Sequence, residues 1–434
     1  MTHNKSPAKI GLWTSTSLVI GNMIASGVFL LPATLATYGG ISLLGWIGSS
    51  VGAIALALLF SNLSRMIPNA LGGPYAYTRA GLGDFAAYLV AWGYWISIWC
   101  TNAAIAVTFV SYLTVFLPIL AKNSFLSVGT GLGVIWLLTW VNTKGVKAAG
   151  RVQIVTTIMK LTPLLLVSIV GLFYININNF IPFNISTESN FSAITATATL
   201  TLFAFLGLES ATIPSGNIHE PEKTIPRATM IGTVVTIFVY MIGSATVMGM
   251  IPAAELKNSN APFADAAALI WGDSARYWVA AGAIVSTFGA LNGWILLQGQ
   301  MPMAASRDKL FPEIFKKENN KGVPATGIII GSILISALML MNFTKGLTNT
   351  FTFMVLLTTI TVLVPYLFSA ASYGVLLLQN KFWKRDLISQ LITAVAAFLF
   401  SMWAIVGSGQ ETVYWGFIAI LSGIPFYVWM KRKQ

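Results

Sequence analysis

Long apolar runs recur along the whole chain, separated by short polar or glycine-rich segments. Each run reaches the roughly 20 residues that an α-helix needs to cross the hydrocarbon core of a membrane. Turn signals such as Gly39-Gly40 and Gly72-Gly73-Pro74 divide the runs. The pattern predicts twelve transmembrane helices: 11–37, 41–66, 84–117, 124–142, 150–174, 192–216, 228–251, 262–300, 324–342, 348–377, 387–408 and 413–430. The long stretch 262–300 is expected to be one tilted helix with a partly interfacial lead-in at 261–273.

The composition supports a membrane protein. Of the 434 residues, 56% are hydrophobic and 9% are charged, and the mean hydropathy is +0.76. Soluble proteins carry roughly 25% charged residues. A surface this poor in charge has to be covered by lipid, so the composition excludes a chain of soluble domains and predicts an all-α integral membrane protein.

The positive charges predict the orientation. A net charge of +12 suggests nucleic acid as a partner only when the basic residues form a patch, and here they lie in short loops between apolar runs. With the N-terminus inside, the inner loops and termini hold 20 Lys and Arg and the outer loops hold 4. The sequence therefore predicts a multi-pass protein of the cytoplasmic membrane, with both termini cytoplasmic and no nucleic acid partner.

Residues for catalysis or metal binding are scarce. Cys100 is the only cysteine, and His3 and His219 are the only histidines. No metal-ligand spacing and no nucleophile–base set is present, so neither an enzyme nor a bound metal or cofactor is expected. The first apolar run is too long for the core of a signal peptide.

Two of the predicted spans contain helix-breaking sequences. Residues 21–32 (GNMIASGVFLLP) interrupt the first span, and residues 203–216 (FAFLGLESATIPSG) interrupt the sixth. Interrupted segments at corresponding places in two halves of a chain are typical of inverted-repeat transporters that bind their substrate between the breaks. The alternative is that these small residues only let helices pack closely.

Two charged residues fall inside predicted spans, Lys160 in the fifth and Glu209 in the sixth. A charge in the membrane interior is costly, so both are candidates for a functional role. Glu209 is expected to carry a proton, and Lys160 to respond to protonation. The structural alternatives are a carboxyl group that braces the break and a lysine that extends toward the membrane surface.

Several segments resemble one transporter superfamily. They are GNMIASGVFLLPATLATYGG at 21–40, GGPYAYTRAGLG at 72–83, FLGLESATIPSGNIHEPEKTIPRAT at 205–229, APFADAA at 261–267, GWILLQGQ at 293–300 and LVPYLFS at 363–369. With them the sequence resembles the amino acid–polyamine–organocation (APC) superfamily. It is most similar to the bacterial basic amino acid/polyamine antiporters, which include the arginine/agmatine type.

The resemblance implies a LeuT-like fold with a five-plus-five inverted repeat, discontinuous helices 1 and 6, and two extra helices. Mapped onto this chain, residues 1–10 are a cytoplasmic N-terminus and 11–174 the first five-helix repeat. Residues 192–377 are the second, inverted repeat, 387–430 are helices 11 and 12, and 431–434 are a cytoplasmic C-terminus. Relatives include both homodimers and monomers, so the oligomeric state stays open.

The resemblance also implies site residues. Ala25, Ser26 and Gly27 would hold a substrate carboxylate, and backbone near Asn22–Met23 and Phe203–Leu206 would hold an ammonium. The implied substrate-binding set is Asn22, Met23, Ala25, Ser26, Gly27, Ser97, Asn102, Phe203, Ala204, Leu206, Trp294 and Thr358. Tyr94, Trp294 and Tyr366 correspond to gate aromatics, and Glu209 to a carboxylate that couples protons to transport.

Two positions depart from the antiporter pattern. These antiporters usually carry Trp where this chain has Phe203, which is a smaller and weaker partner for a cation. Lys160 instead resembles a lysine of proton-coupled symporters in the same superfamily. The predicted function is transport of an amino acid by alternating access, with its decarboxylated amine as exchange partner. Proton-coupled symport of neutral amino acids through Lys160 is the alternative, and a channel or a non-transporting sensor is a third class.

Overall fold

The computed structural model describes residues 10–68, 72–144, 161–213, 218–379 and 387–432. Within these ranges the regular structure is helical, apart from an isolated bridge between Ile10 and Ile218. The α-helices are α1 Leu12–Met23, α2 Gly27–Leu35, α3 Ser42–Met66, α4 Pro74–Leu113, α5 Ile119–Lys122, α6 Ser124–Thr143, α8 Asn190–Leu202, α9 Pro221–Met250, α10 Ala253–Leu256, α11 Pro262–Trp271, α12 Asp273–Arg307, α13 Ala325–Asn342, α14 Leu347–Gln379, α15 Leu387–Gly407, α16 Gln410–Leu421 and α17 Ile424–Lys431. Short 3₁₀ helices include η4 Phe203–Phe205, η5 Ser210–Thr212 and η7 Glu313–Lys316.

The structure confirms the all-α membrane architecture. In the described residues, 11 helical segments are long and apolar enough to cross a membrane, and each overlaps a predicted span. The predicted fifth span, 150–174, is described only over Leu161–Tyr174. The chain is therefore a multi-pass membrane protein.

Glycine interrupts the helices at two places near predicted span boundaries. The span predicted at 84–117 starts where expected: α4 extends from Pro74 to Leu113, but its backbone leaves helical geometry at Gly83, where φ is +80°, so a separate helical segment precedes residue 84. The stretch 262–300, predicted as one tilted helix with a lead-in at 261–273, is two helices separated by Gly272 with φ +83°: α11 covers the lead-in and α12 follows it. Positive φ is accessible to glycine without a steric penalty, so each glycine allows the chain to change direction between two helical segments.

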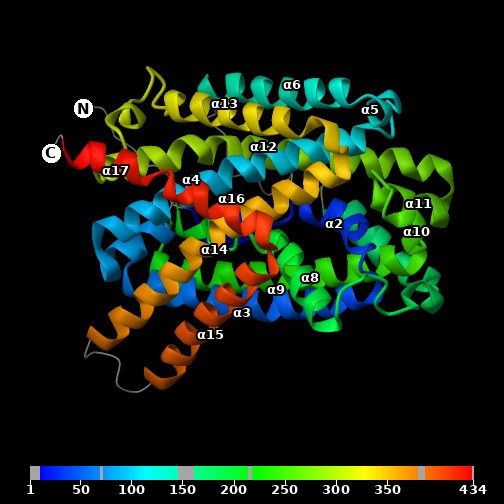
Figure 1. The fold of residues 1–434 in the computed structure, drawn as a ribbon, viewed down its shortest axis with the longest axis horizontal. Helices are drawn as coiled ribbons and strands as arrows, with labels where there is room; N and C mark the ends of the chain where they lie inside the picture. Colours follow the sequence, from blue (N-terminus) through cyan, green and yellow to red (C-terminus); the bar gives the residue numbers. More distant parts are fainter. Residues whose placement is uncertain (1–9, 69–71, 145–160, 214–217, 380–386, 433–434) are drawn as a thin grey trace.

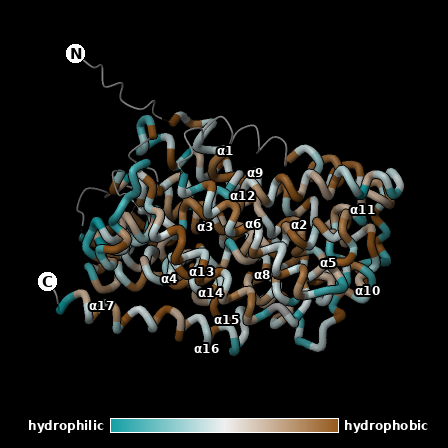
Figure 2. The backbone as a smooth tube through the Cα atoms, turned by 90° about the horizontal axis from the view of Figure 1, so that it is seen from above, coloured by the Kyte–Doolittle hydropathy of each residue, from teal (hydrophilic) through white to brown (hydrophobic). Residues whose placement is uncertain are grey.

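The α15 helix shows why the apolar runs face lipid. Its exposed large side chains recur at helical spacing, at Ile388, Ile392, Val395, Leu399, Met402 and Val406. The opposite face is buried and consists of small residues, Ala394, Ala397, Ser401 and Ala404. An apolar stripe that points outward is stable only against hydrocarbon. Figure 2 shows the hydrophilic backbone mainly near the two ends of the molecule.

The helices run between two ends of the molecule, which we name after the helices there. Figure 1 shows α17 at one end and α5, α10 and α11 at the other. The long helices α4 and α14 pack along each other, and α3 packs against α8 and α9. Three of the four basic residues predicted to be extracellular, Lys122, Lys257 and Arg276, lie in or beside α5, α10 and α12 at the α11 end.

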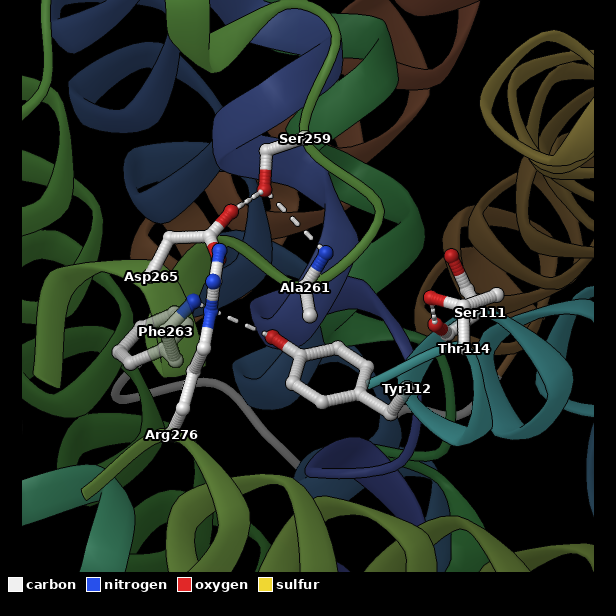
Figure 3. A network of polar contacts seen from close by, with 8 residues as sticks. All are labelled: Ser111, Tyr112, Thr114, Ser259, Ala261, Phe263, Asp265 and Arg276. Carbon is white, nitrogen blue, oxygen red and sulfur yellow. Dashed lines mark hydrogen bonds and ion pairs between the residues drawn. The ribbon is translucent and has the colours of Figure 1, made fainter. Parts of the chain in front are cut away.

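At the α11 end, polar contacts join α4 to α11 and the segments beside it (Figure 3), and Tyr112 also bonds to α2. The Tyr112 hydroxyl donates to the Phe29 carbonyl at 2.9 Å and accepts from the Phe263 N–H at 3.3 Å. Arg276 Nε donates to Asp265 at 3.0 Å, and Asp265 also accepts from the Ser259 hydroxyl. Tyr112 therefore joins the second half of the first span to α11.

Replacing Tyr112 with Phe is expected to destabilise the fold. Tyr112→Phe removes one buried hydroxyl that serves two backbone groups, which costs about 1–3 kcal/mol. The midpoint of thermal unfolding in detergent should fall by roughly 1–3 °C. Tyr414→Phe is the matched control, because Tyr414 is 61% exposed on α16. Equal midpoints for the two variants would show that this contact contributes nothing.

Candidate functional site

The first span is broken near its middle. The α1 helix ends at Met23 and α2 begins at Gly27, with Ile24 outside helical geometry at φ −79° and ψ 76°. The Tyr240 hydroxyl donates to the Met23 carbonyl at 2.6 Å and fixes the end of α1. At the start of α2 the Ser26 side chain makes no capping bond, and its buried hydroxyl has no hydrogen-bond partner among the described residues. This helix start therefore offers unpaired donors to an anion.

The second break follows α8. The chain passes through η4, extends at Leu206 with ψ 135°, and turns at Gly207, where φ is +102°. Glycine at Gly207 allows this turn, and the Ser210 hydroxyl donates to its carbonyl. Both breaks predicted from the sequence are thus present in the structure.

The two breaks lie against each other. A Cβ atom added to Gly27 would sit 2.9 Å from the Ala204 Cβ and 3.1 Å from its Cα. One added to Gly207 would sit 3.2 Å from the Asn22 Cβ. Side chains larger than hydrogen at Gly27 and Gly207 would therefore push the two broken helices apart.

A small cavity lies between the breaks. It has a volume of about 10 Å³ and is lined by Asn22, Met23, Ala25, Ser26, Gly27, Thr101, Phe203, Leu206 and Trp294. This volume holds about one water molecule, so a solute can enter only when the surrounding helices move apart. Eight of the nine lining residues belong to the set implied by the resemblance; Thr101 does not.

A buried carboxylate, that of Glu209, lies on one side of the cavity. Glu209 accepts hydrogen bonds from the hydroxyls of Tyr94 and Tyr366, both at 2.7 Å, and from the Gly207 N–H at 3.2 Å. From Glu209 the chain continues to Ile218, which pairs with Ile10 just before α1. Among the described residues Glu209 is the one charged side chain that is buried. The Tyr94–Glu209–Tyr366 cluster joins α4, the second break and α14 on this side of the cavity.

On the α11 side the cavity is closed by aromatic and hydroxyl contacts. The rings of Phe203 and Phe351 meet edge to face, with their centroids 6.0 Å apart. The hydroxyls of Thr34 and Thr352 are 3.1 Å apart and join α2 to α14. Beyond them lies a larger cavity of about 500 Å³, lined in part by Thr34, Thr352, Glu188 and Lys257.

Four residues of the predicted substrate-binding set do not line the small cavity. The Asn102 amide donates a hydrogen bond to the Gln298 side chain at 2.8 Å, and the Gln298 amide in turn donates one to the Ser332 hydroxyl at 2.9 Å. The Ser97 hydroxyl donates to the Tyr94 carbonyl. Ala204 packs against Gly27, and the Thr358 hydroxyl is buried without a described partner. The binding roles of all the predicted site residues stay predictions, and Lys160 lies outside the described residues.

Thr101 is the lining residue that the sequence reasoning missed. It precedes Asn102 on α4, and one residue along a helix rotates a side chain by about 100°. Asn102 was predicted as a site residue partly because an amide in a membrane helix needs a hydrogen-bond partner. The neighbouring threonine is less conspicuous, since its hydroxyl can bond within its own helix.

The fold and the site together define a multi-pass membrane protein with two broken helices around a small cavity lined by buried residues. The chain belongs to the amino acid permease family, whose model matches residues 10–428. It is 32% identical to a cadaverine/lysine antiporter of Escherichia coli K12, over 97% of this chain and 95% of that protein. It is 30% identical to the putrescine transporter PotE of Haemophilus influenzae, over 98% of each chain. It is 31% identical to an arginine/ornithine antiporter of Pseudomonas aeruginosa, over 94% of this chain and 88% of that protein.

Proposed function

We propose that this chain exchanges a basic amino acid for a related amine or amino acid across the cytoplasmic membrane. The observation that carries the proposal is the small cavity, lined by buried residues, between two facing helix breaks. It places the free start of α2 and the Ser26 hydroxyl opposite the backbone of residues 203–207. Such a pair of breaks suits a molecule with a carboxylate and an ammonium group. The names of the relatives at 30–32% identity supply the solute class, which is dibasic.

The buried acid suits an exchange mechanism. A cationic side chain, a second amine or a proton can each compensate the charge of Glu209, the one buried charge of the described residues. Occupation of the cavity and the charge state of Glu209 are then linked. In this proposal the protein alternates access by opening either the Glu209 side, toward the cytoplasm, or the Phe203–Phe351 side, toward the 500 Å³ cavity.

The proposal includes the orientation and the internal repeat. The excess of Lys and Arg in the loops at the α17 end supports placing both termini in the cytoplasm. The breaks at Gly27 and Gly207 support two five-helix repeats, 11–174 and 192–377, related by inversion. Proton symport of neutral amino acids is less favoured, because two of the three relatives described above are named antiporters and all three names give dibasic solutes.

Counterflow in proteoliposomes tests the function. Vesicles that contain the purified protein are loaded with cadaverine, lysine or buffer alone, and uptake of labelled lysine is followed without a proton gradient. Exchange predicts saturable uptake in the loaded vesicles and little in the empty ones. Equal uptake in empty vesicles that requires a proton gradient would indicate symport, and binding without uptake would indicate a sensor.

Replacing Trp294 is expected to weaken substrate binding. Trp294 is 3% exposed and lines the cavity, and its Nε1–H has no described partner. Trp294→Leu keeps bulk but removes the π face, which contributes about 0.5–2 kcal/mol to binding a cation. The half-saturating lysine concentration should rise by roughly 2- to 30-fold. Trp415→Leu on α16, where Trp415 is half exposed, is the control; a matching rise there would contradict a specific role.

A further inference from the structure

A second, larger cavity lies at the α17 end, away from the substrate site. Its volume is about 660 Å³, and it is formed by the end of α12, the loop with η7, and α17. Figure 1 shows α12 running toward α17 at this end. This cavity plays no part in the proposed exchange mechanism, and its lining combines two kinds of side chain.

One part of the lining is basic. Arg307, Lys309 and Lys316 line the cavity, against a single acid, Glu313. Arg307 is paired with Glu318 at 2.7 Å, and both partners are substantially exposed. Lys431 and Arg432 follow directly on the lining residue Met430. The cavity is therefore positively charged overall, and it suits an anion.

The other part of the lining is apolar and exposed. Ile314 and Trp429 are 50% and 49% exposed and line the same cavity. On α17 the side chains of Phe426 and Val428 are also exposed, as expected for a helix that contacts lipid. A tryptophan at the end of such a helix is typical of the membrane–water boundary. A small soluble anion would gain no binding energy from contact with this apolar wall.

We propose that this cavity binds an anionic phospholipid of the leaflet at the α17 end. The headgroup phosphate lies among Lys309, Lys316 and Arg307, and an acyl chain lies along Ile314 and Trp429. Basic pockets between helices at the cytoplasmic surface recognise anionic headgroups in this way. Charge complementarity selects the headgroup, and the apolar wall selects a lipid over free phosphate.

The site is connected to the transport machinery through aromatic packing. Phe311, in the cavity wall, and Phe315, in η7, lie 5.9 and 5.3 Å from the Trp95 ring, between centroids. Trp95 donates to the Gln298 carbonyl at 3.1 Å, and its neighbour Tyr94 donates to Glu209. A lipid that holds the α12–α13 loop in place would therefore stabilise the closed arrangement on the Glu209 side.

Lipid titration of the purified, full-length protein tests the proposal without a transport assay. The unfolding midpoint is measured in nanodiscs of phosphatidylcholine and of phosphatidylcholine with phosphatidylglycerol at about 3:1. We expect phosphatidylglycerol to raise the midpoint by about 2–5 °C. In detergent, the double variant Lys309→Gln/Lys316→Gln should bind short-chain phosphatidylglycerol at least about tenfold more weakly than the wild type.

The matched control changes the same charge in the same loop. Lys317→Gln/Lys321→Gln removes two lysines that do not line the cavity, and it should respond as the wild type does. An equal loss of binding in both double variants would overturn the proposal in favour of a diffuse surface charge. An equal midpoint shift with inorganic phosphate would overturn it in favour of a simple anion site.

A second measurement, fluorescence quenching, starts from the wild-type protein. It therefore tests the proposal even if Lys309→Gln/Lys316→Gln does not fold. Brominated phosphatidylglycerol should quench tryptophan fluorescence more than brominated phosphatidylcholine does. Trp429→Phe should remove most of that difference. A difference that survives Trp429→Phe would place the lipid elsewhere and contradict the proposal.

Discussion

Exchange by the Glu209→Gln variant is expected to be slow and independent of pH. The carboxylate accepts three hydrogen bonds, from Tyr94, Tyr366 and the Gly207 N–H, and each is made by a buried group. The amide keeps the shape but cannot be charged, so it can neither balance a cationic substrate nor bind and release a proton. Loss of one charged hydrogen-bond acceptor costs about 1.5–3 kcal/mol, so the exchange rate should fall by roughly 10- to 100-fold.

The measurement is lysine–cadaverine counterflow over a series of pH values, with Glu220→Gln as the control. Glu220 is an exposed acid that pairs with Lys223 at the surface, so the same substitution there should leave both the rate and its pH dependence unchanged. A Glu209→Gln protein with the wild-type pH profile would remove Glu209 from the mechanism. In that case its three hydrogen bonds would serve only to brace the second break.

The second large effect is expected from one methyl group at Gly27. The added Cβ would lie 3.1 Å from the Ala204 Cα, which is backbone and cannot rotate away. Overpacking of this kind costs about 1–3 kcal/mol. In Gly27→Ala the two breaks should separate, and the affinity for substrate should fall roughly tenfold or more.

Gly289→Ala is the matched control for Gly27→Ala. Gly289 also lies in a membrane helix, and a Cβ there would meet nothing within 4 Å. Binding of labelled lysine to purified protein compares the two variants, and the unfolding midpoint shows whether each is folded. If Gly27→Ala binds lysine as tightly as Gly289→Ala does, the close approach of the breaks is unrelated to binding.

Local patterns were sufficient to predict the spans and the breaks. The stripe of Ile388, Ile392 and Val395 on α15 repeats at helical spacing, which hydropathy detects directly. The breaks were visible because glycine, serine and asparagine cluster inside apolar runs. Glu209 was visible because a charge in the membrane interior is rare and costly.

Long-range pairing could not be predicted from the sequence. Asn102 bonds to Gln298, which is 196 residues away, and so faces a helix partner rather than the small cavity. Thr101 lines that cavity because of the rotation of α4, which depends on how α4 packs against α12 and α14. The turns at Gly83 and Gly272 lie beside the predicted start at residue 84 and the end of the predicted lead-in 261–273, but the positive φ values there could not be predicted from hydropathy.

Substrate protection of one engineered thiol tests the central claim most directly. Cys100, the only cysteine, is first removed by Cys100→Ala, and a single new thiol is then introduced at the start of α2 by Ser26→Cys. If the solute binds between the two breaks, lysine should slow the reaction of the introduced thiol with a small thiol reagent, with half-protection at the concentration that half-saturates exchange. A protein that exchanges lysine while its labelling rate is unchanged at saturating lysine would contradict the account.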